Sequence, residues 1–390
     1  MLGSLEIVPL PTIDAALGCR RQCKILRISA DGTKEHSVLW IEIPANLETE
    51  ENDCDPFLMM LLMEAMREKL SIKIHGTVDQ ELLSNLTEFQ KFWHRCQPTT
   101  FAEVPIEVAA VTHGRPVNER AICTFTGGLD SSCSVWRHSQ QLRGHRNRRI
   151  DLACMLHGAD IPLSNRSGFT AAFKKAAETL ESVGIKLAAA RTNFREISRV
   201  NWEDSHGTVI GATLSCFKPM AGIGLIASGK PYDNLRMAAW GSSPITDPLL
   251  SSSTFRVIHD GADQDRSEKA QELLGWEHAL RNLRVCWAGS KVDQNCGHCH
   301  KCILTKLNFM VMGADIPPAF PPSDILNDIR SLVMPDDIDA CKEWNMMLGH
   351  ANAKGIEAEW VQAAREKATK EPKLSKRRKL LRSIGKLLQH

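Results

Sequence analysis

The segment Ala121-Ile-Cys-Thr-Phe-Thr-Gly-Gly-Leu-Asp-Ser-Ser132 decides how this chain is interpreted. Its apolar start, Ala121–Phe125, predicts a buried strand, and the residues after Ser132 predict a helix. The paired glycines Gly127 and Gly128 have no Cβ, so the backbone can turn sharply there and approach a ligand closely. The amide groups of such a turn and the positive end of the following helix form an anion site, and phosphate is its natural occupant.

Hydroxyl and carboxyl side chains surround this predicted turn. Thr126, Ser131 and Ser132 can donate hydrogen bonds to phosphate oxygens. Asp130 would repel a phosphate unless a cation lay between them, so we assign it to Mg²⁺, which favours carboxylates together with substrate phosphates. The alternative is a plain glycine turn between a strand and a helix. The predicted nucleotide-binding residues are Thr124, Phe125, Thr126, Gly127, Gly128, Leu129, Asp130, Ser131, Ser132 and, after the next strand, His157.

The bulk properties of the chain exclude several classes of protein. Its 390 residues suffice for two or three domains. A net charge of +2 predicts no strong field for nucleic acid or membranes from the chain as a whole. The longest apolar run, Phe57–Met63, is too short to span a bilayer, and we see no signal peptide. Nine of the thirteen cysteines are scattered singly, as small buried residues of a reducing compartment are, so we expect a cytoplasmic protein.

Three segments of the chain differ in pattern, and we expect them to be its domains. Residues 1–117 predict an α+β module in which we recognise no catalytic constellation. Residues 118–313 carry the glycine turn and a cysteine motif. Residues 314–390 predict short helices and a basic tail around Lys376–Lys379. The tail fits a solvated helix, with docking to nucleic acid, anionic lipid or a partner as the alternative.

From Arg120 onward, strand patterns alternate with helix patterns, which predicts an α/β fold: a parallel sheet with helices on both faces. In an open sheet of this kind, ligands bind beyond the carboxyl ends of the strands, where the strand order reverses. We expect strands at Cys23–Ser29, Ser37–Pro44, Phe101–Val111, Ala121–Phe125, Ile150–Leu156, Lys186–Ala190, Gly222–Ala227, Phe255–Ile258 and Leu283–Val285. We expect helices at Phe57–Lys69, Thr77–Trp93, Ser131–Leu142, Gly168–Val183, Thr208–Met220, Ser267–Leu283 with a break near Gly275, Ile303–Gly313 and Asp324–Leu332.

Cationic side chains follow two of the predicted strands. Arg195 comes after the third strand of the α/β segment, and Arg266 and Lys269 open the helix after the fifth. Cations at these positions would neutralise phosphate charge as pyrophosphate departs. Together with Asp130, these three residues are the predicted catalytic residues.

Four cysteines cluster near the end of the α/β segment. Their spacing is Cys286-x9-Cys296-Gly-His-Cys299-His-Lys-Cys302. Four thiolates with this spacing fit tetrahedral zinc, and because they fill the coordination shell the metal should be structural. An iron–sulfur cluster is the alternative, since Cys-x2-Cys-x2-Cys occurs there too. Disulfides do not fit a reducing compartment.

Thr126-Gly-Gly-Leu-Asp-Ser131 resembles the PP-loop of the N-type ATP pyrophosphatases, written Ser-Gly-Gly-x-Asp-Ser, with Thr126 in the first position. With the cysteine motif following in order, residues 120–313 resemble the 7-cyano-7-deazaguanine synthase (QueC) family. The resemblance implies an adenine-nucleotide α-hydrolase-like fold, a structural Zn²⁺, and ATP with Mg²⁺ at the loop. It also implies adenylation of a carboxylated deazapurine, with release of pyrophosphate. In that family ammonia then gives an amide, and a second activation gives a nitrile.

The chain departs from that family at both ends. About 117 residues precede the resembling segment, and a basic tail follows it. In this layout the chain is similar to the longer QueC-like proteins of bacterial anti-phage loci, the QatC type. The amine acceptor is therefore open, and an amine on a protein is included. Two other functions stay open: a non-catalytic nucleotide-binding subunit of a defence complex, and a PP-loop enzyme that modifies tRNA. A homodimer is also considered.

Overall fold

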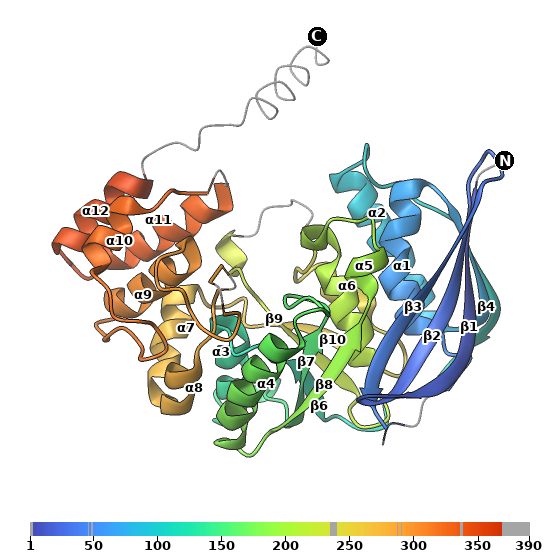
Figure 1. The fold of residues 1–390 in the computed structure, drawn as a ribbon, viewed down its shortest axis with the longest axis horizontal. Helices are drawn as coiled ribbons and strands as arrows, with labels where there is room; N and C mark the ends of the chain where they lie inside the picture. The colour runs from blue at the N-terminus through green and yellow to red at the C-terminus, as the bar shows by residue number, and fades with distance from the viewer. Residues whose placement is uncertain are drawn as a thin grey trace, which may run out of the picture. The chain divides into compact units, whose positions relative to one another are not determined.

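The computed structural model describes residues 3–45, 47, 50–234, 240–286, 288–289, 291–335 and 338–368. The chain divides into two compact units, Met1–Asp263 and Gln264–His390 (Figure 1). The basic tail around residues 376–379 lies outside the described residues, so its docking role stays a prediction. Within the described part, no helix combines the length and apolar character that crossing a membrane requires.

The first unit is organised around one ten-stranded sheet (Figure 1). Its strand order is β10-β9-β6-β7-β8-β3-β2-β1-β4-β5. The pairs β1–β2, β2–β3 and β3–β8 are antiparallel, and the other neighbouring pairs are parallel. The strands are β1 (Ser4–Ala15), β2 (Gly18–Ile28), β3 (Lys34–Pro44), β4 (Ser71–Asp79), β5 (Ile106–Thr112), β6 (Ala121–Thr124), β7 (Ile150–His157), β8 (Lys186–Thr192), β9 (Ile223–Ala227) and β10 (Arg256–Asp260).

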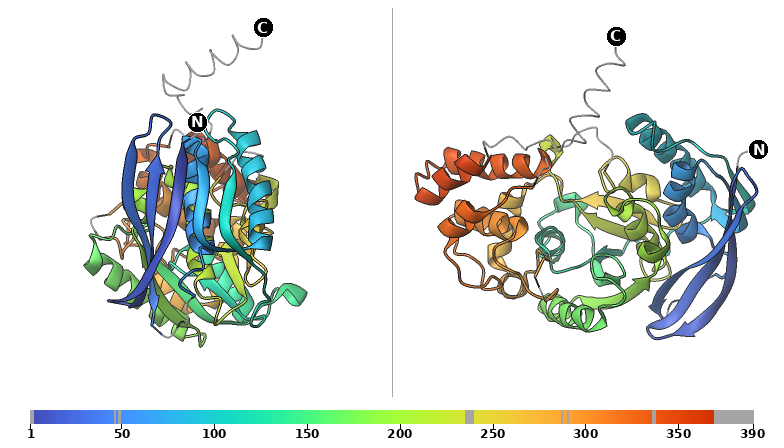
Figure 2. Two further views of the ribbon diagram at one scale, coloured as in Figure 1. Left: turned by 90° about the vertical axis from the view of Figure 1, so that its right-hand side faces the viewer. Right: turned by 45° about the horizontal axis from the view of Figure 1, so that its top comes forward.

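Helices flank this sheet, as the α/β prediction requires. Helices α1 and α2 pack along the N-terminal strands, and α1 also packs against α6 (Figure 2). Helix α3 packs against β6, β7 and β9, and α4 against β8. The helices are α1 (Asp55–Glu68), α2 (Gln80–Cys96), α3 (Leu129–Ser139), α4 (Arg166–Glu181), α5 (Phe194–Ile197) and α6 (Trp202–Ser215), with 3-10 turns η1 (Gly144–Arg146), η2 (Tyr232–Asn234) and η3 (Asp247–Leu250).

The N-terminal strands join the same sheet as the α/β strands. Strands β3 and β8 pair over only two residue pairs. Asn193, directly after β8, prolongs the junction: its side-chain oxygen accepts from the Trp40 amide at 2.9 Å, and its amide nitrogen donates to the Val38 carbonyl at 2.8 Å. Residues 1–117 therefore share a sheet with the segment that follows them. Sequence patterns missed β1 and β4, two of the strands that make this continuity.

Most predicted elements of the first unit are confirmed within a few residues, but two are displaced. The helix expected at Thr208–Met220 is wrong in its bounds, since α6 begins at Trp202. The reason is a cap, because the Asn201 side chain accepts a hydrogen bond from the Glu203 amide at 3.3 Å. The strand expected at Phe101–Val111 begins only at Ile106.

The second unit is helical where it is described. Residues of α9, α10, α11 and α12 form its core, with Trp344 fully buried. The predicted break near Gly275 is confirmed, because the 3-10 turn η4 separates α7 from α8. The elements are α7 (Arg266–Glu272), η4 (Leu273–Gly275), α8 (Glu277–Asn282), α9 (His300–Val311), α10 (Ile325–Ser331), α11 (Ile338–Ala353) and α12 (Glu359–Ala368).

The strand expected at Leu283–Val285 is wrong, because no strand forms there. The side chain of Asn295 forms the backbone hydrogen bonds that a neighbouring strand would have formed. The Asn295 side-chain oxygen accepts from the Val285 amide at 2.9 Å, and its nitrogen donates to the Leu283 carbonyl at 2.7 Å. One buried asparagine thus satisfies backbone groups that a sheet would otherwise have paired.

Candidate functional site

The glycine turn lies where the strand order of the α/β strands reverses. Among these strands the order is β8-β7-β6-β9-β10, so successive strands run outward from β6 in one direction and then in the other. The turn at residues 126–128 follows β6 directly. Ligands of open α/β sheets bind beyond the carboxyl ends of the strands at such a reversal. The strand order therefore brings the predicted nucleotide loop to the expected place.

Long internal hydrogen bonds link residues of the loop to one another. The Thr126 amide donates to Ser131 Oγ at 3.5 Å, and the Gly128 amide donates to Thr126 Oγ1 at 3.4 Å. Ser131 Oγ donates to the Gly128 carbonyl at 3.3 Å. These distances lie at or beyond the long end of the usual range.

Backbone conformation at the loop explains its glycines. Gly127 has φ of +74°, a left-handed conformation that residues with a Cβ rarely adopt. Gly128 is the N-cap of α3 in extended conformation and has no side chain with which to cap the helix. The first amide groups of a helix have no partner within the helix, so the start of α3 offers them to a ligand.

Asp130 lies in the first turn of α3 and is half-buried. An acidic residue there stabilises a helix by itself, and Glu81 has the same place in α2. A magnesium role for Asp130 therefore stays a prediction. The side chains of Phe125, Leu129 and Ser132 are buried, so these residues can offer a ligand mainly their backbone groups.

Helix α3 is fixed to the sheet through Asp260 at the end of β10. The Asp260 carboxylate accepts from Ser134 Oγ at 2.5 Å and from an Arg143 nitrogen at 3.0 Å, and lies 3.4 Å from His138 Nε2. Burial alone would raise the pKa of Asp260, but its neighbours His138, Arg143 and Ser134 together hold it well below its usual range. The Asp260 carboxylate therefore has a structural role: it holds helix α3, which begins at the loop, against the end of β10.

His157 and Arg195 occupy different surroundings. The His157 ring is buried, stacks on Phe169 with centroids 4.3 Å apart, and has Nε2 2.9 Å from the Pro162 carbonyl oxygen. Burial lowers the pKa of His157, against the opposing effect of that hydrogen bond. Arg195 is exposed, lies over the Trp202 ring at 5.1 Å, and donates to the Ala159 carbonyl at 2.6 Å. Arg195 is therefore the better placed of the two to meet a ligand.

Arg266 and Lys269 belong to the second unit, on α7. Arg266 donates to the Glu343 carboxylate at 2.8 Å, and Lys269 is 2% exposed. Arg266 is thus paired within its own unit, and Lys269 is buried. Their predicted role on phosphate stays a prediction.

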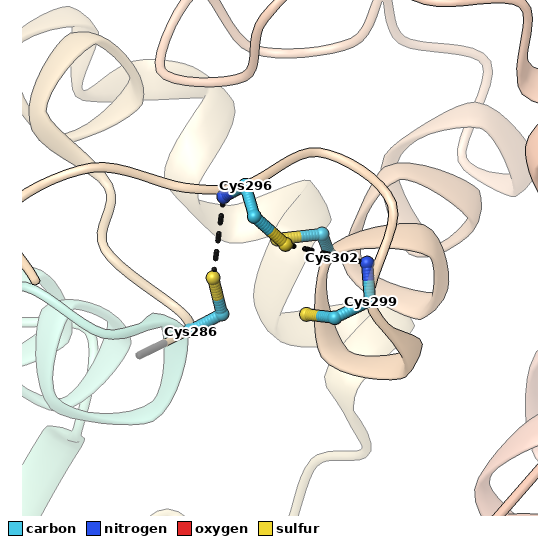
Figure 3. Close-up of side chains that lie close together, drawn as sticks. All are labelled: Cys286, Cys296, Cys299 and Cys302. Atoms are coloured by element: carbon cyan, nitrogen blue, oxygen red, sulfur yellow. Dashed lines mark hydrogen bonds between the residues drawn. The ribbon is translucent and has the colours of Figure 1, made fainter. Parts of the chain in front are cut away.

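The four clustered cysteines converge on one point (Figure 3). All four sulfur atoms lie within 4.8 Å of one another, and the Sγ atoms of Cys296 and Cys302 are 3.9 Å apart. Tetrahedral Zn–S bonds of about 2.3 Å place sulfur atoms about 3.8 Å apart. The Cys296 amide donates to Cys286 Sγ and the Cys299 amide to Cys296 Sγ, both at 3.3 Å. The cluster therefore has the donor set and spacing of a metal site such as a four-thiolate zinc site.

Two neighbouring residues shape this site. Gly297 has φ of +87°, and a Cβ there would lie 2.7 Å from Pro321 Cγ, so the turn between Cys296 and Cys299 requires glycine. Asn295, 6% exposed, also donates to the Ala319 carbonyl at 3.1 Å, and so fixes the backbone beside two of the ligands. The motif residue His298 is exposed, and the Trp344 indole donates to His300 Nε2 at 2.9 Å.

One pair was not predicted from sequence. Asp247 and His259 are twelve residues apart, and the structure places their side chains 2.7 Å apart in the interior of the first unit. The only sequence signal was that both follow predicted strands of the α/β segment. Each residue type is common after a strand, so their pairing required the strand order.

No family model, curated protein or solved structure matches this sequence. The likeness to the QueC family therefore rests on the loop residues and the four cysteines. The geometry of these two sites is what supports a function.

Proposed function

We propose that this protein binds ATP at residues 126–132 and transfers AMP to a carboxylate, releasing pyrophosphate. The observation that carries this proposal is the position of the loop. A turn requiring glycine, followed by the start of a helix without a side-chain cap, lies where the strand order reverses. Phosphate groups bind to exposed helix amides at such positions.

The chemistry needs little beyond positioning and charge stabilisation. The loop amides and the hydroxyls of Thr126 and Ser131 would hold the phosphates, and Asp130 would hold Mg²⁺ against them. The α-phosphorus would then face the carboxylate, in a geometry that removes much of the entropic cost of reaction. No protein nucleophile is required.

The substrate class follows from the resemblance to the QueC family. It is a carboxylated deazapurine or a similar heterocycle, and the activated carboxyl passes to an amine, either ammonia or an amine on a protein. A cytoplasmic place in an anti-phage or deazaguanine-modification pathway belongs to the same proposal. The four cysteines would hold zinc that stabilises the second unit and has no part in the reaction, because four thiolates leave no open coordination position.

This proposal is tested by identifying the products that the protein forms from ATP. The protein is incubated with ATP, Mg²⁺ and carboxy-deazaguanine, and the nucleotide products are separated by chromatography. We expect AMP and pyrophosphate, and Asp130→Ala should abolish both. Glu81→Ala removes the corresponding acidic residue of α2 and should leave turnover unchanged. ADP as the product contradicts the proposal, and so does ATP binding without turnover, which favours a scaffold subunit.

A further inference from the structure

The last two residues of β10, His259 and Asp260, point to opposite faces of the sheet. Asp260 points to α3 and the turn after it, where Ser134, His138 and Arg143 surround its carboxylate. Side chains alternate along a strand, so His259 points to the other face. Its hydrogen bond to Asp247 of η3, which packs against α6, confirms this direction. Asp260 is thus committed to structure, whereas His259 faces a different environment.

His259 is held by one of its two ring nitrogens. Its Nδ1 lies 2.7 Å from Asp247 Oδ2, and both side chains are at most 4% exposed. The Asp247 carboxylate also accepts from Ser242 Oγ at 2.7 Å and from the Ser243 amide at 3.2 Å. With its oxygens engaged in this way, the Asp247 carboxylate accepts a hydrogen bond from a protonated Nδ1, so the lone pair of the neutral ring is on Nε2.

The other nitrogen, Nε2, is buried and has no hydrogen-bond partner among the described residues. Buried polar atoms are nearly always paired, so an orphan of this kind calls for an explanation. The pair lies close beneath the surface, because Ser242 and Ser243, which bind Asp247, are half-buried and Ile245 is 43% exposed. A ligand that displaces these residues slightly could supply the missing partner.

His259 also lies at the same edge of the sheet as the nucleotide loop. Leu225 of β9 pairs with Cys123 of β6 on one side and with Ile258 of β10 on the other. His259 is therefore level with Thr124 and on the same face, two strands away. Two strand spacings are about 10 Å, which an activated substrate at the loop can bridge.

We propose that His259, oriented by Asp247, accepts the proton that the amine loses when it attacks the activated carboxyl. This inference rests on the proposed function. The amine nitrogen forms a bond to the carbonyl carbon, and one N–H proton passes to Nε2. The bond between the carbonyl carbon and the AMP oxygen then breaks, and AMP leaves with the electron pair. Such proton transfer contributes about 10²–10⁴-fold to a rate.

The test separates the two halves of the reaction in the full chain. Carboxylate-dependent exchange of pyrophosphate into ATP reports adenylation, and amide formation from ammonium reports capture. His259→Asn keeps an amide nitrogen near the position of Nδ1, so the bond to Asp247 can persist while Nε2 is lost. His94→Gln, a control outside the site in α2, alters a histidine whose Nδ1 lies 2.8 Å from the Phe101 carbonyl oxygen.

We expect His259→Asn to retain exchange and to lose amide formation by about 10²–10⁴-fold. Hydroxylamine, a nucleophile that gives up its proton more readily, should restore capture in this variant, and the control should match the wild type throughout. Equal losses with ammonium and hydroxylamine, or loss of exchange together with capture, overturn the role of His259. No exchange in the wild type overturns the proposed function and this inference with it.

Discussion

The glycine loop and the four-cysteine cluster differ in what each contributes to its own site. The cluster supplies all four donor atoms from side chains, already within 4.8 Å of one another. The loop has mainly backbone amides to offer a ligand, and contacts of 3.3–3.5 Å link its hydroxyls to the loop backbone. The donor atoms of the first site are thus already gathered by side chains, whereas we propose that the second site would bind its ligand mainly through backbone groups. Substitutions at the cluster should therefore lower the stability of the fold, and substitutions at the loop should weaken the binding and turnover of ATP.

The largest expected effect comes from removing a sulfur of the cluster. Cys299→Ser should reduce the zinc content from about one ion per chain to near zero, because four-thiolate sites bind structural zinc with large free energies, about 10–16 kcal/mol in peptides. The second unit should then unfold at a lower temperature. Metal analysis and calorimetry measure both, with Cys341→Ser outside the cluster as the control. Unchanged zinc in Cys299→Ser, or iron in its place, would refute the zinc assignment.

The next effect concerns the support behind the loop. Asp260→Asn leaves the buried charge of Arg143 without its carboxylate and should cost about 3 kcal/mol of unfolding free energy. Because the folded pKa of Asp260 is depressed, its contribution is present above the unfolded pKa of about 4 and is lost as the pH falls further. The difference between wild type and variant should be largest near pH 7 and shrink below pH 4. A difference that is independent of pH counts against this ion pair.

Asn295 tests how the cluster is held. Asn295→Ala should leave the Val285 amide and the Leu283 carbonyl unpaired, at a cost of about 1–3 kcal/mol for a buried group. Zinc should remain bound but exchange faster with a chelator, since all four sulfurs are intact. Urea unfolding and competition with a chromogenic chelator give the two values. Zinc exchange at the wild-type rate in Asn295→Ala would show that Asn295 supports the backbone but not the metal site.

The smallest effect separates the two glycines of the loop. Gly127→Ala places a Cβ at φ of +74° and should cost about 1–2 kcal/mol, whereas Gly128→Ala at φ of −77° should cost little strain. Unfolding free energies of the two variants measure this difference. Both should weaken ATP binding if the phosphates approach the backbone there. Equal unfolding free energies of the two variants would show that a Cβ at residue 127 does not strain the turn.

Sequence patterns predicted the elements around both sites for identifiable reasons. The strand at Ala121–Thr124, the following turn and the cysteine spacing are local features, and the structure has them. Of what the patterns missed, one feature is local and another depends on residues farther along the chain. The helix at Trp202–Ser215 begins at a cap one residue before it, Asn201, whereas the backbone at 283–285 forms no strand and is paired by the side chain of Asn295.

The pairing of His259 with Asp247 shows the same limit at the candidate site. Neither residue stands in a motif, and their meeting depends on the order of β9 and β10 and on the packing of η3. Arg266 and Lys269 show the reverse case, because local patterns selected them, yet one pairs with Glu343 and the other is buried. Structural features that are local in sequence were predictable, whereas pairs of residues brought together by the strand order were not.

The most direct measurement is a crystal structure of the full chain with Mg²⁺ and an ATP analogue that resists cleavage between the α- and β-phosphates. We expect phosphates against the amides of residues 127–131, with Mg²⁺ between them and Asp130, at the carboxyl end of β6. A nucleotide bound elsewhere, or one at this loop with its α-phosphate turned away from any space for a carboxylate, would refute ATP activation at this loop.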